Sequence, residues 1–168
     1  MRSVGLSSRR GGWKGLRFLA DSMHGELSRW LRMLGYDTVY SSTADNELLN
    51  RALSEGRILL TSDKELHRRT LVKGGESILI PLKGTEDKLA AIANYLRSRH
   101  GVSHREFLKV KAVRCSLCNG PLERRTRNRW RCRDCRQEYW VGGHWRNISK
   151  TLVTVESLLA SAPGNEKE

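Results

Sequence analysis

The sequence predicts an α/β fold in which helices cover both faces of a parallel sheet, with a small four-cysteine zinc ribbon appended. Three observations predict it. Short apolar runs alternate with helical patterns through the first hundred residues, the loops between them are short, and all four cysteines fall in one later segment. The length of 168 residues suits one domain of ordinary size plus a small module.

Each element is predicted from its apolar pattern. Strands are expected where short apolar or alternating runs occur, at residues 17–21, 36–42, 57–63 and 76–82. Helices are expected where apolar residues recur at i, i+3, i+4 and i+7 or a charged stretch follows a strand, at residues 24–35, 46–56, 64–75, 86–101 and 148–162. Asp45 and Thr85 stand where the second and fourth of these helices need an N-cap.

The chain divides into five expected segments. They are a flexible basic leader at 1–15, the sheet domain at 16–104, the zinc ribbon at 105–146, a C-terminal helix at 147–162 and a tail at 163–168. The leader lacks the apolar stretch of a secretory signal. No run approaches the ~18 apolar residues of a membrane span. We therefore expect a cytoplasmic protein without a membrane partner.

Positive charge is concentrated in one part of the chain. The formal net charge is +13, and residues 101–150 hold 13 Lys and Arg against 4 Asp and Glu. A polyanion is the natural partner of such a segment, and nucleic acid is the commonest polyanion. The alternative is a solvated basic surface that only aids solubility.

The four cysteines form two pairs with the spacing of a zinc site. The pairs read CSLC and CRDC and are separated by 13 residues, so that Cys115, Cys118, Cys132 and Cys135 can meet at one ion. A disulfide framework is the alternative, but it requires an oxidising compartment. Four thiolates leave no open coordination position, so we expect a structural zinc ion. For the same reason His144 is not needed as a ligand.

Three aspartates are expected at one edge of the sheet. Asp21 ends the first predicted strand, Asp45 opens the helix after the second, and Asp63 ends the third. Ligands of open parallel sheets bind at the carboxyl ends of the strands, and several carboxylates in one crevice suit Mg²⁺ or Mn²⁺. The alternative is that Asp45 and Asp63 only cap helices. Asp37 begins its strand and should lie at the opposite edge, in a structural role.

These motifs together resemble a known family. The stretches FLADSMHGELSRWLRMLGYDT, ADNELLNRALSEGRILLTSDKEL, CSLCNGPL and CRDCRQEYWVGGHW are similar to the Mut-seven C-terminal RNase domain family. That family has a PIN-like nuclease fold that carries a zinc ribbon, and the resemblance spans residues 17–146. It implies a metal-dependent ribonuclease with Asp21, Asp45 and Asp63 in the positions of the PIN-type acids.

The sequence departs from the family pattern in two places. Ser62 stands where the family usually has Arg, which removes a potential phosphate contact. PIN nucleases also usually have a Glu between the first and later acids, and here Glu26 and Asp37 are the acidic residues between Asp21 and Asp45. Neither is well placed, so three acids rather than four are expected at the site.

The expected function is therefore hydrolysis of RNA by water that Mg²⁺ or Mn²⁺ activates, with the ribbon holding the RNA backbone. The residues expected to contact RNA are Arg124, Arg125, Arg127, Arg129, Arg131 and Arg133. Trp130 can stack on a base or pack within the ribbon. Trp140 and Trp145 are expected to dock the ribbon on the nuclease domain.

Two other functions fit the sequence. The first is a non-catalytic protein that binds RNA, tRNA or the ribosome with the same fold. The second is a DNA-binding regulator that uses the ribbon. The regulator ranks below the other readings, because no helix-turn-helix is apparent and a single ribbon offers little base readout.

Overall fold

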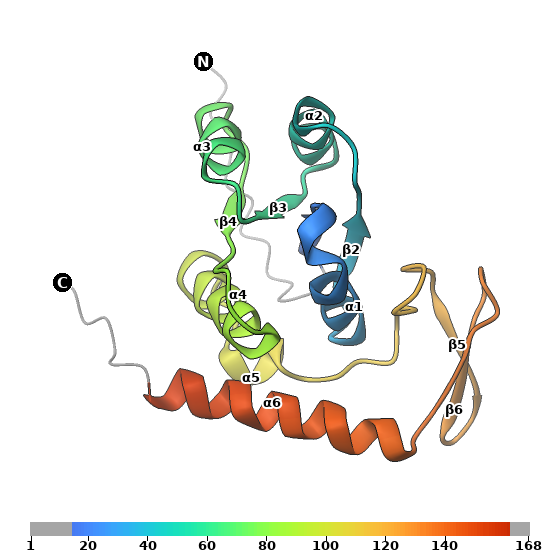
Figure 1. Cartoon of the computed structure of the whole chain (residues 1–168). Helices are drawn as coiled ribbons and strands as arrows, with labels where there is room; N and C mark the ends of the chain where they lie inside the picture. Colours follow the sequence, from blue (N-terminus) through green and yellow to red (C-terminus); the bar gives the residue numbers. More distant parts are fainter. Residues whose placement is uncertain (1–14, 162–168) are drawn as a thin grey trace.

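The structure is a computed structural model that describes residues 15–161. The predicted tail and nearly all of the predicted leader lie outside the described residues. Within that range no helix is long and apolar enough to span a bilayer. Figure 1 shows a sheet domain, a ribbon set to one side of it, and a long C-terminal helix that runs beneath both.

A parallel sheet of four strands forms the centre, as the sequence predicts. Its strand order is β2-β1-β3-β4, and every neighbouring pair is parallel. The strands are shorter than expected because the turn residues at their ends leave the ladder. They are β1 (Arg17–Ala20), β2 (Asp37–Tyr40), β3 (Ile58–Thr61) and β4 (Ser77–Leu79).

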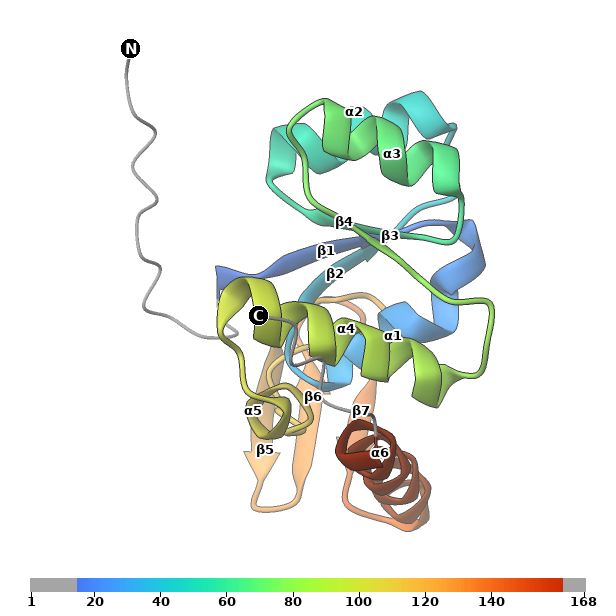
Figure 2. The same cartoon turned by 90° about the vertical axis from the view of Figure 1, so that its left-hand side faces the viewer.

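Helices cover both faces of this sheet. They are the 3₁₀ turn η2 (Ser22–His24), α1 (Gly25–Met33), α2 (Asp45–Glu55), α3 (Lys64–Val72) and α4 (Thr85–His100). Helices α2 and α3 lie on one face and α1 and α4 on the other (Figure 2). The alternating strand side chains follow this division, since Leu19 and Leu59 pack with α2 and α3 while Phe18 and Leu60 pack with α1 and α4.

Two predicted helix caps differ from the structure. Helix α2 has Ala44 at its N-cap and α4 has Gly84, and neither cap makes a side-chain hydrogen bond. Asp45 and Thr85 are instead the first helical residues. There a carboxylate still favours the helix through its dipole, and the hydroxyl of Thr85 is free to donate to Oε1 of Glu26 at 3.1 Å.

The expected zinc ribbon contains three strands. It comprises β5 (Leu122–Thr126), β6 (Arg129–Cys132) and β7 (Glu138–Trp140), which form an antiparallel sheet in the order β5-β6-β7. The short run of β7 carries too weak an alternation to be recognised from sequence.

Two helices complete the chain. The short α5 (His104–Phe107) was not predicted, and α6 (Gly143–Ser161) begins five residues before its expected start at residue 148. Helix α6 packs along α4, where its Val155 is fully buried. Because α6 starts directly after the ribbon, it ties the ribbon to the sheet domain.

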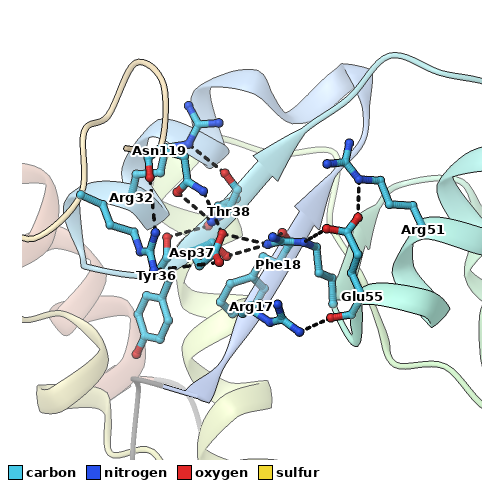
Figure 3. Close-up of polar contacts among 11 residues, drawn as sticks. Arg17, Phe18, Arg32, Tyr36, Asp37, Thr38, Arg51, Glu55 and Asn119 are labelled. Carbon is cyan, nitrogen blue, oxygen red and sulfur yellow. Dashed lines mark hydrogen bonds and ion pairs between the residues drawn. The ribbon is translucent and has the colours of Figure 1, made fainter. Parts of the chain in front are cut away.

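The predicted docking role of Trp140 and Trp145 is wrong. Trp140 is 60% exposed and Trp145 is 41% exposed. The ribbon is instead attached through polar contacts with the edge strand β2 (Figure 3). Arg32 donates to the carbonyls of Ser116 and Leu117 at 3.0 and 3.1 Å and to that of Thr38 at 2.9 Å.

Asn119 completes this attachment. Its Oδ1 accepts from the Thr38 amide at 3.1 Å, and its Nδ2 donates to Oδ1 of Asp37 at 2.8 Å. Arg32 and Asn119 therefore bind both backbone polar groups of Thr38. A sheet edge is otherwise open to pairing with another chain, and these contacts close it.

Candidate active site and metal centre

The strand register brings two of the predicted acids to one edge of the sheet. Ala20 at the end of β1 pairs with Tyr40 of β2 and with Leu60 of β3. The next residues, Asp21 and Thr61, are therefore neighbours at the carboxyl edge. The chain passes from β1 outward to β2 and then back to β3 on the other side, so this edge is a topological switch point, where α/β folds bind ligands.

Asp21 is held in one orientation there. The residue is 8% exposed, and its Oδ2 accepts from the Thr61 hydroxyl at 2.6 Å. Its Oδ1 accepts from the amide of Met23 at 3.2 Å, so Asp21 caps the 3₁₀ turn η2. The Thr61 hydroxyl also accepts from the Asp63 amide at 3.0 Å. One buried hydroxyl thus connects the strand ends that carry Asp21 and Asp63.

A buried histidine lies beside Asp21. The side chain of His24 is fully buried, and its Nε2 lies 2.9 Å from the Ser62 hydroxyl and 3.9 Å from Oδ1 of Asp21. Ser62 donates its own proton to the carbonyl of Ile80 at 2.8 Å, so His24 donates to Ser62 through Nε2. Burial lowers the pKa of His24, although the Asp21 carboxylate opposes the effect.

Asp63 and Asp45 differ in how they are held. Asp63 caps α3, and its Oδ1 accepts from the amides of Glu65 and Leu66 at 2.8 and 3.0 Å. Asp45 is exposed in the first turn of α2. Over residues 15–161 the carboxylates of Asp21, Asp45 and Asp63 do not gather into a tight ligand cluster; the four cysteines form the one such group.

Asp37 lies at the opposite edge, where the sequence places it. Arg57 and Asn119 donate to its Oδ1 at 2.9 and 2.8 Å, and Arg114 lies 3.9 Å from its Oδ2. Burial acts to raise the pKa of Asp37, but these hydrogen bonds and charges outweigh it and lower the pKa below its usual value. Arg57 also pairs with Glu55, so a network of ions occupies this edge (Figure 3).

The four cysteines form a compact metal-binding cluster. Their sulfur atoms all lie within 4.8 Å of one another. Cys115 and Cys135 are 3.6 Å apart, and Cys118 and Cys132 are 3.4 Å apart. A disulfide requires about 2.05 Å, whereas zinc–sulfur bonds of about 2.3 Å in a tetrahedron place sulfurs about 3.8 Å apart. The cluster can therefore bind a metal such as zinc, and the four cysteines are not joined by disulfides.

Both cysteine pairs have the same backbone geometry. The residue after each pair, Asn119 or Arg136, has a φ of 68°. In each case its amide donates to the carbonyl of the first cysteine of the pair, at 2.9 and 3.2 Å. These two tight turns, which we call the zinc knuckles (residues 115–119 and 132–136), face each other. His144 is exposed and is not part of the cluster.

Tyr139 supports the cluster from β7. Its hydroxyl lies 3.0 Å from Sγ of Cys115 and accepts from the Ser116 amide at 3.2 Å. Burial acts to raise the pKa of Cys115, but hydrogen bonds from Tyr139 and from backbone amides lower it to about 7. These hydrogen bonds favour the thiolate of Cys115, which is the form that binds metal, whereas burial raises the pKa of Cys118 to about 12.

Strand pairing separates the ribbon arginines. Paired residues share a face, and successive rows alternate. Arg124 therefore lies with Trp130 and Tyr139 on one face, while Arg129, Arg131 and Trp140 lie on the other. The remaining predicted contacts are Arg125 at a bulge, Arg127 in the turn and Arg133 in the second knuckle, all of them exposed.

Sequence reasoning missed three side chains around these sites. Thr61 and His24 carry no recognisable signal, because a buried hydroxyl and a buried imidazole are identified only by their neighbours. Trp140 was assigned to docking, yet it is the exposed aromatic beside Arg129. Glu26 lies in the first turn of α1 and is exposed.

A comparison with models of protein families bears on the combination of an acidic sheet edge and a four-cysteine ribbon. The model of the Mut7-C RNAse domain matches residues 16–152. No curated protein and no solved structure matches the chain. The match includes the parallel sheet with its acidic edge and the whole four-cysteine ribbon, and it agrees with the resemblance that the sequence motifs indicate. The chain therefore belongs to the Mut7-C RNase domain family.

Proposed function

We propose that the protein is a metal-dependent ribonuclease that hydrolyses RNA phosphodiester bonds at the carboxyl edge of its parallel sheet. The observation that carries the proposal is the position of Asp21. It is a buried carboxylate at the topological switch point, fixed by Thr61, in a chain whose family is named for RNase activity. A carboxylate held in one orientation at the sheet edge where α/β folds bind ligands supports a role in binding a cation.

Carboxylate oxygens are the type of ligand that a hard divalent ion prefers. Asp21, Asp45 and Asp63 would hold Mg²⁺ or Mn²⁺ with carboxylate oxygens. Such ions keep several waters and need only one or two direct protein ligands, so the three side chains need not close into a tight cluster. When bound, the ion supplies a Lewis acid for the phosphoryl group and makes water more acidic.

The residues of the chain supply orientation. Thr61 holds Oδ2 of Asp21, which leaves the carboxylate no freedom to rotate away from the edge. Asp63 uses Oδ1 for its cap, so its Oδ2 is the atom that would face an ion. His24 holds the hydroxyl of Ser62, the residue between Thr61 and Asp63, through a hydrogen bond. The side chain of His24 is fully buried, so it cannot touch RNA.

The ribbon would bind the RNA backbone. Its exposed arginines can contact phosphates, and Trp140, which is exposed and pairs with Arg129 across β6 and β7, can stack on a base. The cysteine cluster would hold a structural zinc ion that keeps the knuckles folded. Glu123 and Glu138 approach these arginines at 3.6–4.0 Å and partly offset their charge.

A non-catalytic RNA-binding protein is the second candidate. The observation that favours it is that Asp63 serves as a helix cap and that the three acids do not converge into one tight ligand group. In that case the aspartates of the acidic edge would have structural roles alone, and the function would be to bind RNA or the ribosome.

Cleavage by wild type and by Asp21→Asn, purified in parallel, distinguishes the two. We expect wild type to cleave mixed cellular RNA in Mg²⁺ or Mn²⁺, and Asp21→Asn to bind RNA equally or more tightly without cleaving it. The substitution keeps the shape and removes a charge that repels RNA. Asp45→Asn and Asp63→Asn should also lose cleavage.

Asp37→Asn is the matched control, since it changes an aspartate at the opposite edge; it should be less stable than wild type but should keep activity while it is folded. Chelation should abolish cleavage and Mg²⁺ or Mn²⁺ alone should restore it. Equal cleavage by wild type and Asp21→Asn would place the activity elsewhere or in a contaminant. RNA binding without cleavage by wild type would favour the second candidate.

A further inference from the structure

An open groove runs along the edge of the sheet domain toward the ribbon. Its volume is about 970 Å³. One wall is α1, with Gly25, Glu26 and Arg29, and the floor includes the carboxyl end of β2 at Tyr40. The first zinc knuckle contributes Leu117 and Cys118.

The contacts around the groove establish its direction. The knuckle is fixed at Thr38 by Asn119 and Arg32, whereas Tyr40 lies two residues further along β2, next to the acidic edge. Helix α1 runs alongside from Arg32 at the knuckle to Gly25 at the edge, about 10 Å at 1.5 Å per residue. The groove therefore leads from the zinc knuckle to the residues around Asp21.

Tyr40 is a fixed aromatic surface at the end of this groove. Its hydroxyl donates to the carbonyl of Ser22 at 2.9 Å, and the residue is 43% exposed. Its ring lies against Gly25, where a Cβ would stand 3.4 Å from the ring carbon Cζ. A ring held at both ends loses little entropy when another flat group stacks on it.

We propose that this groove binds a single strand of RNA and guides it from the ribbon to the acidic edge, with one base stacked on Tyr40 and a phosphate bound by Arg29. The inference rests on the proposed ribonuclease function, whose substrate path it defines. Arg29 is exposed, lines the groove, and forms no ion pair with any of residues 15–161. Stacking and backbone charge together are the usual means of binding single strands.

Two substitutions test the stacking surface and the phosphate contact separately, and each has a matched control variant. Tyr40→Leu removes the stacking surface and should weaken RNA binding about tenfold, while Tyr40→Phe should stay within twofold. Arg29→Ala should weaken binding about threefold and reduce the log–log salt slope by about 0.7. Arg97→Ala, an exposed arginine on α4 outside the groove, should change neither. Glu26→Gln should tighten binding, because it removes a negative charge from the wall.

The measurement uses the full chain carrying Asp21→Asn. The probe is a fluorescein-labelled oligouridine of 20 nucleotides that contains 4-thiouridine. Fluorescence anisotropy gives the affinity of each variant, circular dichroism confirms its fold, and ultraviolet crosslinking with mass spectrometry locates the RNA. We expect crosslinks on the peptides that contain Tyr40 and Leu117. Cleavage by the same variants in the otherwise wild-type chain is measured in parallel.

The outcomes separate this inference from the ribonuclease proposal. Cleavage by wild type together with unchanged binding in Tyr40→Leu and Arg29→Ala, and crosslinks confined to the ribbon, would overturn the groove and leave the ribonuclease. Crosslinks in the groove with no cleavage by wild type would support the groove and overturn the ribonuclease. Absence of both binding and cleavage would overturn both and would leave the groove to a protein partner.

Discussion

Thr61 shows how a single hydroxyl can organise the acidic edge. The residue is completely buried at the end of β3, and its oxygen donates to Asp21 while accepting from the amide of Asp63. A buried carboxylate without such a donor would turn toward water or take up a proton. The geometry of Asp21 therefore depends on a neighbour that does not touch RNA.

We expect Thr61→Val to reduce cleavage by about 10- to 100-fold, the usual effect of losing a residue that orients a metal ligand. Valine keeps the shape and removes the hydroxyl, whereas Thr61→Ser keeps the hydroxyl and should retain most activity. The apparent Mg²⁺ affinity, read from the metal dependence of cleavage, should weaken in the valine variant alone. RNA binding should not change, and a loss of binding equal to the loss of cleavage would argue against a positioning role.

Asp37 ties the acid stability of the fold to the ribbon contact. Because its pKa in the folded protein is lowered, the folded state gains stability from the ionised carboxylate at neutral pH. That contribution is complete above the unfolded pKa near 4 and disappears as the pH falls through the lowered pKa of the folded state.

At pH 7, Asp37→Asn should therefore unfold at a lower urea concentration than wild type. Its free energy of unfolding should be lower by about 1.5–3 kcal/mol, the usual contribution of hydrogen bonds to a charged group. The difference from wild type should shrink as the pH is lowered below about 4. Urea titrations at several pH values measure it. A difference that stays constant over that range would mean that the charge of Asp37 is not responsible.

At the scale of elements, the first zinc knuckle acts as a cover for the edge strand β2. Asn119 has two roles in it, since its backbone adopts the left-handed conformation that the turn requires and its side chain binds Asp37 and Thr38. Glycine can adopt the same backbone conformation but lacks the side chain. Two substitutions at this one position therefore separate the turn from the docking contact.

Asn119→Gly should lower the free energy of unfolding by about 1–3 kcal/mol, because the Thr38 amide loses its partner. Asn119→Ala should cost about 1–2 kcal/mol more, because alanine is strained at a φ of 68°. Hydrogen exchange should rise at Thr38 in both variants. Unchanged exchange at Thr38 would mean that the ribbon is held on β2 by other contacts.

At the scale of the whole molecule, the chain combines two units with different sources of stability. The sheet domain buries two apolar clusters, one on each face of the sheet. The described part of the ribbon buries little besides Cys115 and Cys132. We therefore expect a unit with so little apolar core to depend on a bound metal, which supplies on the order of 10 kcal/mol in small zinc modules.

We expect one zinc ion per chain by metal analysis, and we expect its removal to unfold the ribbon while the sheet domain stays folded. Hydrogen exchange should then rise over residues 114–140 and at β2, and stay low in β1 and β3. A protein that purifies without metal, or whose sheet domain unfolds together with the ribbon, would contradict this division.

The basic surface makes a second prediction at this scale. If the ribbon engages about five phosphates, the affinity for single-stranded RNA should fall with salt at a log–log slope of about −3.5. Replacing Arg125, Arg127 and Arg129 with alanine should flatten the slope by about 2 and leave the fold intact. Anisotropy titrations at several salt concentrations test both statements. Binding that ignores salt would identify the segment as a solvated face.

The order of the strands and α-helices from β1 to α4 was determined by the sequence alone. Apolar runs such as residues 57–63 can be buried only in a sheet covered on both faces, and the helical pattern of residues 24–35 exposes one apolar stripe to cover it. The cysteine spacing likewise predicts the metal-binding cluster, because two tight turns with paired thiols have few other stable uses. These features depend on local pattern and chemistry, which the order of residues contains.

The tertiary structure decided which neighbours each polar group has. Asp45 was expected to cap a helix, yet it caps nothing, whereas Asp21 caps η2. Trp140 was expected to be covered and is exposed, while Asn119 attaches the ribbon. The Asn119 contact joins residues 81 positions apart in the chain. A local pattern shows which side chains must be buried, but only the packed chain determines what a buried or exposed polar group meets.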